Sequence, residues 1–319
     1  MTPASIDEQL SKYLTDAHSI EEQALAQLRV APGLAGEPEL ADALRDHLAE
    51  TEGHEQLVRA RLEARGASPS RVKDLVMKAG GLGFVLFAKS QPDTPGKLAA
   101  HAYSYEHLEL ASYELLMRVA QRAGDHDTAV AAGSIRDEEA RMAQRLEGLF
   151  DRTVEASLRD VGPDDLTVQL AKYMADAHAV ETQSAQLLER APSLTDDPEL
   201  QRVYAEHLEE TRGHLRTLEE RLAAHEAEPS RLKDAALRLG GLNWGAFFQA
   251  QPDTPGKLAA FAYAVEHLEA GGYEQLKRVA QRAGDLETAH AAERILGEEH
   301  AAAQKIAGTW DRVVDASLS

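Results

Sequence analysis

The chain has 319 residues, 43% of them hydrophobic, and a formal net charge of −20. This length suits one large domain or two of ordinary size. So acidic a chain is not expected to bind nucleic acid or an anionic membrane, because both need a basic surface, although it can attract cations. No apolar run approaches the roughly 20 residues of a membrane span, and no signal-peptide pattern opens the chain, so we expect a cytoplasmic protein. The absence of cysteine excludes disulfides and thiolate chemistry.

The sequence consists of two copies of one unit, residues 1–159 and 161–319, which align at a constant offset of 160 positions. QPDTPGKLAA begins at positions 91 and 251, RVAQRAGD begins at 118 and 278, and about half of all paired positions are identical. Gly162 and Pro163 interrupt the helical pattern at the join. We therefore predict two domains of one fold, an arrangement compatible with an intramolecular pseudo-dimer or a homo-oligomer.

Each half is predicted to contain four long helices and no strands. In the first half the pattern predicts helices over 6–30, from 37 to about 65, from 92 to 124, and from 125 through Leu149. The connections are short except for the middle segment 67–91, which contains Gly80-Gly81-Leu82-Gly83. This order predicts an all-α fold of two tandem ferritin-like four-helix bundles, each with a long crossover between helices two and three.

The third helix carries glutamate on an otherwise apolar face. Tyr103, Glu106, Leu110, Tyr113 and Met117 recur every three or four residues, which places them on one side of a helix. An unpaired carboxylate in such a place costs several kcal/mol or becomes protonated. The glutamates nevertheless persist in the second copy, so they need a partner.

Acids and one histidine fall on the inner stripes of all four helices. The candidate residues are Glu21, Glu50, His54, Glu106, Glu109, Glu138 and Glu139 in the first half, and Glu181, Glu210, His214, Glu266, Glu269, Glu298 and Glu299 in the second. Facing carboxylates cannot all ionise in a dry core, whereas a pair of divalent cations would neutralise them, as in other helical bundles. Oxygen-rich ligands with few imidazoles favour a dinuclear iron or manganese site over zinc.

A second interpretation needs no metal. Glutamate is a common helix residue, and a rotation by one position moves it from the interior to the rim, where Arg61 or Arg118 can pair with it. Tyrosine hydroxyls can also donate to inward carboxylates. The remaining paired histidines are expected to support the ligands or to lie hydrogen-bonded at the rim; they are His18, His47 and His107, with His178, His207 and His267.

Three stretches resemble one family. The run HLAETEGHEQLVRARLEARG from His47, the Glu-His-Leu-Glu run followed by Tyr113, and the Glu-Glu pair of helix four are similar to the YciE/YciF-type ferritin-like stress proteins, the domain of unknown function 892. The resemblance covers each half nearly end to end and implies a carboxylate-bridged dinuclear centre. It implicates Glu21, Glu50, His54, Glu106, Glu109 and Glu139.

The candidate site departs from the usual ferritin-like pattern, which has Glu-x-x-His on two helices. Here Glu50 has its histidine four residues on, and Glu139 has Met142 three residues on. Two functions are therefore open. One is a dinuclear protein that handles peroxide or ferrous ion. The other is a non-enzymatic stress or scaffold protein with a degenerate or absent metal site, whose glycine-rich apolar segments at Gly80 and Gly240 contact a partner.

Overall fold

The computed structural model describes residues 5–70, 93–229 and 254–318. Every regular element within these ranges is a helix, which confirms the all-α prediction. The chain divides into two compact units, and each is described by itself: an N-terminal unit up to Arg159 and a C-terminal unit over Asp160–Ser317. The predicted crossover and the glycine-rich segments at Gly80 and Gly240 lie largely or wholly outside the described residues.

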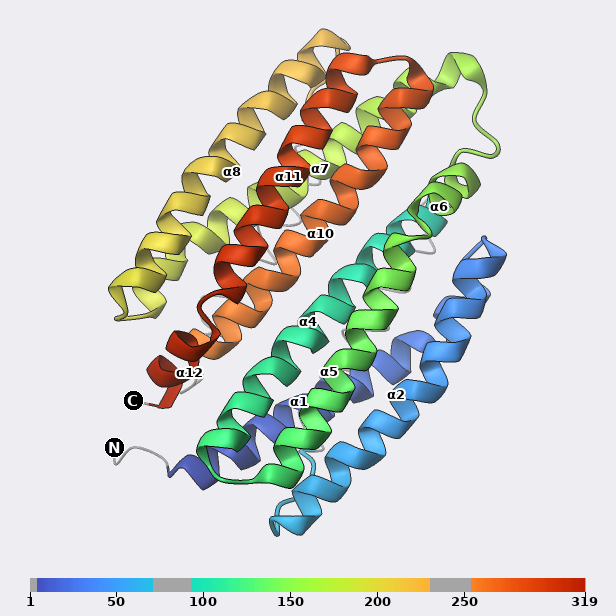
Figure 1. The fold of residues 1–319 in the computed structure, drawn as a ribbon. Helices are drawn as coiled ribbons and strands as arrows, with labels where there is room; N and C mark the ends of the chain where they lie inside the picture. The colour runs from blue at the N-terminus through green and yellow to red at the C-terminus, as the bar shows by residue number, and fades with distance from the viewer. Residues whose placement is uncertain (1–4, 71–92, 230–253, 319) are drawn as a thin grey trace. The chain divides into compact units, whose positions relative to one another are not determined.

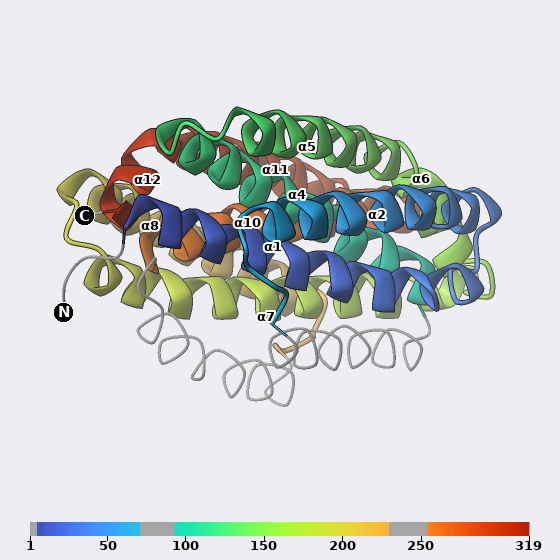
Figure 2. The same cartoon turned by 90° about the horizontal axis from the view of Figure 1, so that it is seen from below.

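Within its described residues, the N-terminal unit contains four long helices and one short one. Figures 1 and 2 show how they are arranged. In chain order they are α1 (Ile6–Leu28), α2 (Pro38–Ala64), α4 (Thr94–Arg122), α5 (His126–Glu147) and α6 (Phe150–Ser157), with a 3-10 turn at Ala31–Gly33 after α1. α1 packs on α2, α2 on α5, α5 on α4, and α4 back on α1. These contacts close around a shared interior.

The C-terminal unit repeats this arrangement. Its helices are α7 (Leu166–Arg190), α8 (Pro198–Ala224), α10 (Thr254–Ala283), α11 (Leu286–Ala307) and α12 (Trp310–Leu318), with 3-10 turns at Pro163–Asp165 and Ala191–Leu194. The long helices again contact one another in a closed cycle of α7, α8, α11 and α10.

Local sequence signals set the helix ends. The Ser5 hydroxyl accepts from the Glu8 amide while Glu8 reaches back to the Ser5 amide, a capping box that starts α1. Pro38 occupies the first turn of α2, where its missing N–H costs nothing. Gly124 follows α4 with φ 72°, a left-handed conformation that favours glycine. The short link lets α5 turn back along α4.

The predicted apolar stripes line the interior. Leu14, Leu25, Val58, Ile135 and Leu146 are each at most 4% exposed. Burial of these side chains supplies the main driving force for packing the helices. Within the described ranges, no helix combines the length and the apolar character that crossing a bilayer requires.

The fourth predicted helix is two helices in the structure. α5 ends at Glu147 instead of continuing through Leu149, and α6 begins at Phe150, whose ring packs edge-on against Tyr103 with centroids 5.4 Å apart. At the other end of α6 the buried Ser157 hydroxyl accepts from the Gly96 amide at 2.9 Å. Gly96 lies in the first turn of α4, where amide N–H groups have no hydrogen-bond acceptor within the helix. Ser157 of α6 therefore supplies an acceptor for one of them.

Replacing Ser157 by alanine is expected to destabilise the N-terminal unit by about 1 kcal/mol, because the buried Gly96 amide loses this acceptor. Ser317→Ala removes the same contact to Gly256 in the C-terminal unit and should cost a similar amount. Urea unfolding followed by circular dichroism measures both. Ser134→Ala, at an exposed position, is the control, and equal midpoints for Ser134→Ala and Ser157→Ala would contradict the prediction.

Candidate metal centre

Acids and histidines of the N-terminal unit meet inside the ring of helices. On α2, the buried positions His47, Thr51, His54 and Val58 recur every three or four residues and form its inner stripe. α4 contributes Glu106 and Glu109, α1 contributes Glu21, and α5 contributes Glu139, and all four carboxylates are at most 3% exposed.

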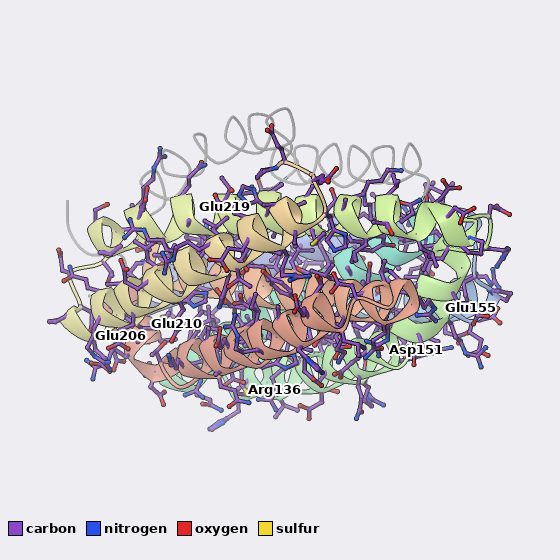
Figure 3. The ribbon with its side chains drawn as sticks, turned by 90° about the horizontal axis from the view of Figure 1, so that it is seen from above. Arg136, Asp151, Glu155, Glu206, Glu210 and Glu219 are labelled. Atoms are coloured by element: carbon purple, nitrogen blue, oxygen red, sulfur yellow. The ribbon has the colours of Figure 1, made fainter. Side chains whose placement is uncertain are left out.

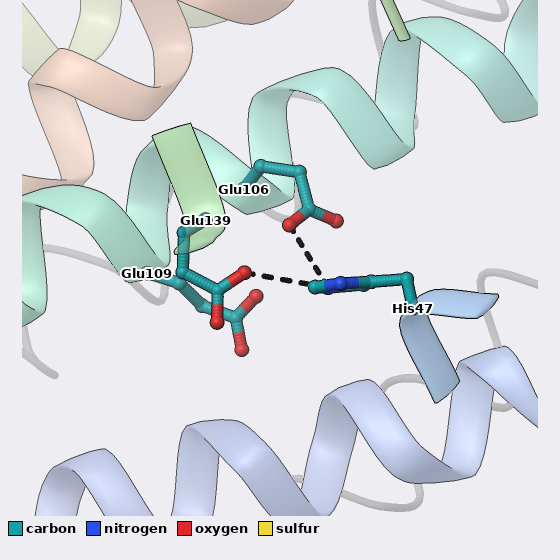
Figure 4. A group of neighbouring side chains, drawn as sticks. All are labelled: His47, Glu106, Glu109 and Glu139. Carbon is teal, nitrogen blue, oxygen red and sulfur yellow. Dashed lines mark ion pairs between the residues drawn. The ribbon is translucent and has the colours of Figure 1, made fainter. Parts of the chain in front are cut away.

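Four of these side chains form the first cluster, which consists of His47, Glu106, Glu109 and Glu139 (Figure 4). The His47 Nε2 atom lies 3.1 Å from Glu106 Oε2 and 3.3 Å from Glu139 Oε2. One potential ligand atom from each residue lies within 4.8 Å of the others. The cluster therefore joins α2, α4 and α5 at a single point.

The second cluster consists of Glu21, His54 and Glu139, and it shares Glu139 with the first. His54 Nδ1 lies 2.8 Å from Glu139 Oε1 and 4.0 Å from Glu21 Oε1. Glu139 thus presents Oε1 to His54 and Oε2 to His47. A single carboxylate between two histidines links the two clusters.

The C-terminal unit contains the same pair of clusters. They are His207, Glu266, Glu269 and Glu299, and Glu181, His214 and Glu299. His207 Nε2 lies 2.7 Å from Glu266 Oε2 and 3.7 Å from Glu299 Oε2, and His214 Nδ1 lies 2.8 Å from Glu299 Oε1. Glu299 occupies the linking position that Glu139 has in the N-terminal unit.

The polar atoms that face each other here lack ordinary partners. Both Glu139 oxygens, His47 Nε2 and His54 Nδ1 are buried and make no hydrogen bond of acceptable geometry among the described residues, although they lie at ion-pair distances. Buried polar groups are nearly always satisfied, and convergent unsatisfied oxygen and nitrogen atoms are suitable ligands for a cation. The residues present therefore fit a metal ion.

Without a cation, the clusters retain protons. Burial, together with the charge of Glu139, raises the pKa of Glu21 from 4.5 to about 8. Burial also raises the pKa of Glu139 to about 7, even though the adjacent His54 imidazole acts in the opposite direction. For His47, burial lowers the pKa, but the negative charges of Glu106 and Glu139 outweigh burial and raise the pKa to about 10. A bound cation would take the place of these protons.

Two predicted candidates of each unit lie outside the clusters. The Glu50 side chain is half exposed, and its Oε2 accepts from His47 Nδ1 at 3.1 Å; Glu138 Oε2 accepts from His54 Nε2 at 2.7 Å. Glu210 and Glu298 make the same contacts to His207 and His214. These four carboxylates fix which ring nitrogen of each histidine faces inward, a common arrangement around metal-binding histidines.

His47 and His207 are members of the clusters, whereas the sequence predicts a supporting role for them. The sequence feature that identifies them is their seven-residue spacing to His54 and His214. This spacing puts two histidines on one helix face two turns apart. His107 lies elsewhere, since its Nδ1 donates to the Tyr103 carbonyl oxygen at 2.8 Å.

The alternative partners proposed for the inward acids are partly present. Arg61 pairs with Asp125, and Arg118 pairs with Glu114, neither of which is in a cluster. Tyrosine does contribute, because the Tyr113 hydroxyl donates to Glu21 Oε1 and the Tyr273 hydroxyl donates to Glu181 Oε1 at 2.6 Å. Each donated bond holds one oxygen of a carboxylate whose other oxygen is left for a ligand.

One further group, His18, Glu22 and Glu55, belongs to the N-terminal unit alone. His18 Nε2 lies 2.8 Å from Glu55 Oε1, and the Arg59 guanidinium donates to that same oxygen. A cation would have to compete with the guanidinium charge. The C-terminal counterparts are His178, Thr182 and Leu215, so this group is not duplicated.

The fold and the clusters define a class: an all-α protein with two buried histidine–glutamate centres that can hold metal ions. A model of one family, described as "Domain of unknown function (DUF892)", matches residues 5–159 and again residues 166–319. The chain therefore belongs to this family, and the double match confirms the tandem duplication and the resemblance found in the sequence. No solved structure matches the chain.

Proposed function

We propose that each unit is a ferritin-like four-helix bundle that holds two iron or manganese ions and acts on peroxide or ferrous ion. The observation that carries the proposal is the shared carboxylate. Glu139 belongs to both clusters of its unit, and Glu299 belongs to both clusters of the other. A carboxylate between two cation positions is the feature that distinguishes a dinuclear site from two separate ones.

The composition of the ligand set supports the same conclusion. Each unit offers four carboxylates and two imidazoles, the composition that ferritin-like di-iron and di-manganese carboxylate bundles use. Its distribution over the helices is different, because in the N-terminal unit both histidines lie on α2 and two glutamates lie on α4. A set rich in oxygen, with no sulfur ligand, favours iron or manganese.

Each residue would have a defined role. Glu139 would bridge; Glu21 and His54 would complete one position, and His47, Glu106 and Glu109 would complete the other. A bound pair of redox-active metals supplies the capacity to exchange electrons with peroxide or with ferrous ion. The chain's own part is to hold the ligands apart from bulk water, to orient the imidazoles through Glu50 and Glu138, and to fix Glu21 through the Tyr113 hydroxyl.

Metal content tests the proposal. The protein, reloaded with Fe²⁺ without oxygen or with Mn²⁺, then desalted, should retain about two ions per unit by mass spectrometry. The double variant Glu106→Ala plus Glu266→Ala should retain fewer. Peroxide consumption and ferrous oxidation are then assayed on the loaded protein. If the reloaded native protein retains neither metal, the proposal is overturned.

A further inference from the structure

A surface cavity of about 470 Å³ reaches the candidate metal centre of the C-terminal unit. It lies between α8 and α11, and its lining includes His214, whose side chain is only 1% exposed. His214 Nε2 donates to Glu298 Oε2 at 2.8 Å on the cavity side, and His214 Nδ1 faces Glu181 and Glu299 on the other. The His214 imidazole therefore lies between the cavity and the other two members of the cluster, Glu181 and Glu299.

The charge of the cavity wall suits a cation. Its lining contains four glutamates, Glu209, Glu210, Glu220 and Glu298, against two arginines, Arg216 and Arg294. Three of the glutamates are ion-paired: Glu209 with Arg212, Glu210 with Lys305 and Glu298 with Arg294. Figure 3 labels Glu210 on α8 together with Glu206, one turn before it, and Glu219, further toward the end of the helix. An acidic cavity raises the local concentration of divalent cations.

Arg294 holds Glu298, one of the carboxylates in the cavity lining. Its Nη1 lies 3.0 Å from both oxygens of Glu298, one turn away on α11, and its Nη2 donates to Thr217 Oγ1 on α8 at 3.3 Å. The guanidinium thus spans the cavity from one helix to the other. It fixes Glu298 against His214 and places a positive charge in the cavity wall.

The N-terminal unit has the same histidine–carboxylate pair without this arginine. Glu138 accepts from His54 Nε2 at 2.7 Å, but Ser134 and Leu57 stand where the C-terminal unit has Arg294 and Thr217. Arg141 pairs with Glu138 at a longer distance of 3.6 Å, and its side chain is 69% exposed. Glu138 is therefore held less firmly than Glu298.

We propose that the cavity is the entry route for divalent cations to the C-terminal centre. In this proposal the ion pair between Arg294 and Glu298 acts as a latch, meaning that it must open before a cation enters, so the C-terminal unit takes up metal more slowly than the N-terminal unit. A cation that arrives in the cavity binds Glu298 in place of Arg294. Glu298 and the His214 ring then turn aside together, and the ion passes to Glu181 and Glu299. The inference rests on the proposed metal-binding function.

The rate of Mn²⁺ uptake by each unit tests the latch. Glu139→Ala leaves the C-terminal centre to be followed alone, and Glu299→Ala leaves the N-terminal one. Free Mn²⁺ is followed by electron paramagnetic resonance after mixing, and the final content is measured by mass spectrometry. We expect slower uptake in the Glu139→Ala background than in the Glu299→Ala background.

The chain supplies a matched pair of substitutions. Arg294→Ser gives the C-terminal unit the residue of the N-terminal one and should speed its uptake roughly two- to fivefold, the range expected from losing an exposed ion pair, with no change in final content. Ser134→Arg should slow uptake by the N-terminal unit. Both positions are exposed, so folding should be preserved.

The outcomes separate this inference from the function on which it rests. Normal final content with an unchanged rate in Arg294→Ser would overturn the latch and leave the metal centre standing. A final content of zero in both single-centre backgrounds and in the native chain would overturn the metal centre and, with it, the entry route.

Discussion

Replacing Glu139 by alanine is expected to remove about half of the metal bound by the whole chain, since Glu139 belongs to both clusters of the N-terminal unit. Glu109→Ala, which removes a ligand from the first cluster alone, should remove about a quarter. The C-terminal unit keeps its own ligands and serves as an internal standard. Mass spectrometry of the reloaded, desalted variants measures these ratios.

The chain provides a control for this series. Glu147 is exposed at the end of α5, on the same helix as Glu139, and the C-terminal unit has Ala307 there. Glu147→Ala should therefore leave the metal content unchanged. If Glu139→Ala lost no more metal than Glu109→Ala, the two positions would not depend on one carboxylate, and the dinuclear proposal would be in error. Circular dichroism confirms that the variants remain folded.

The sequence predicts the helical class and most of the buried acids for a physical reason. Glu21 and Glu139 lie three or four residues from apolar side chains on both sides, so the helical period alone assigns them to the interior. The duplication adds a second copy of each pattern. The all-α class and the family membership follow from the same residues.

The sequence could not predict the exact rotation of each helix about its own axis, because a shift by one residue position changes which side chains face the interior. On α2 the glutamate at 50 and the threonine at 51 differ by about 100° around the helix, and either can be assigned to the inner face from spacing alone. Packing decides in favour of Thr51, which is fully buried, so His47 and His54 point inward and Glu50 lies at the rim. The break between α5 and α6 is similarly hidden, because the apolar pattern continues across Gly148.

The metal-free protein is expected to lose stability as the pH rises from about 5.5 to 9. The pKa of Glu21 is raised in the fold from 4.5 to about 8, and that of Glu139 to about 7, so the folded state binds protons that the unfolded chain releases. For His47 and His54 the folded pKa values of about 10 and about 9 also exceed 6.5. Stability from these histidines is complete below pH 6.5 and is lost as the pH rises through the folded values. All four groups change stability in the same direction.

Manganese should reverse this dependence. Each pKa unit corresponds to about 1.4 kcal/mol, so the cluster groups together destabilise the metal-free N-terminal unit by several kcal/mol at pH 9 relative to pH 5.5. Binding of Mn²⁺ needs ionised carboxylates and neutral imidazoles, so the stabilisation it gives grows with pH. Thermal unfolding at both pH values, with a chelator or with Mn²⁺, measures the effect. The expected melting temperature of the chelated protein is about 10 °C lower at pH 9, and that of the loaded protein changes much less.

Parallel curves with and without Mn²⁺ would show that these groups exchange no protons for metal. The pH slope of the chelated protein should persist in Glu147→Ala and weaken in Glu139→Ala, because only the second variant removes a carboxylate that retains a proton in the fold.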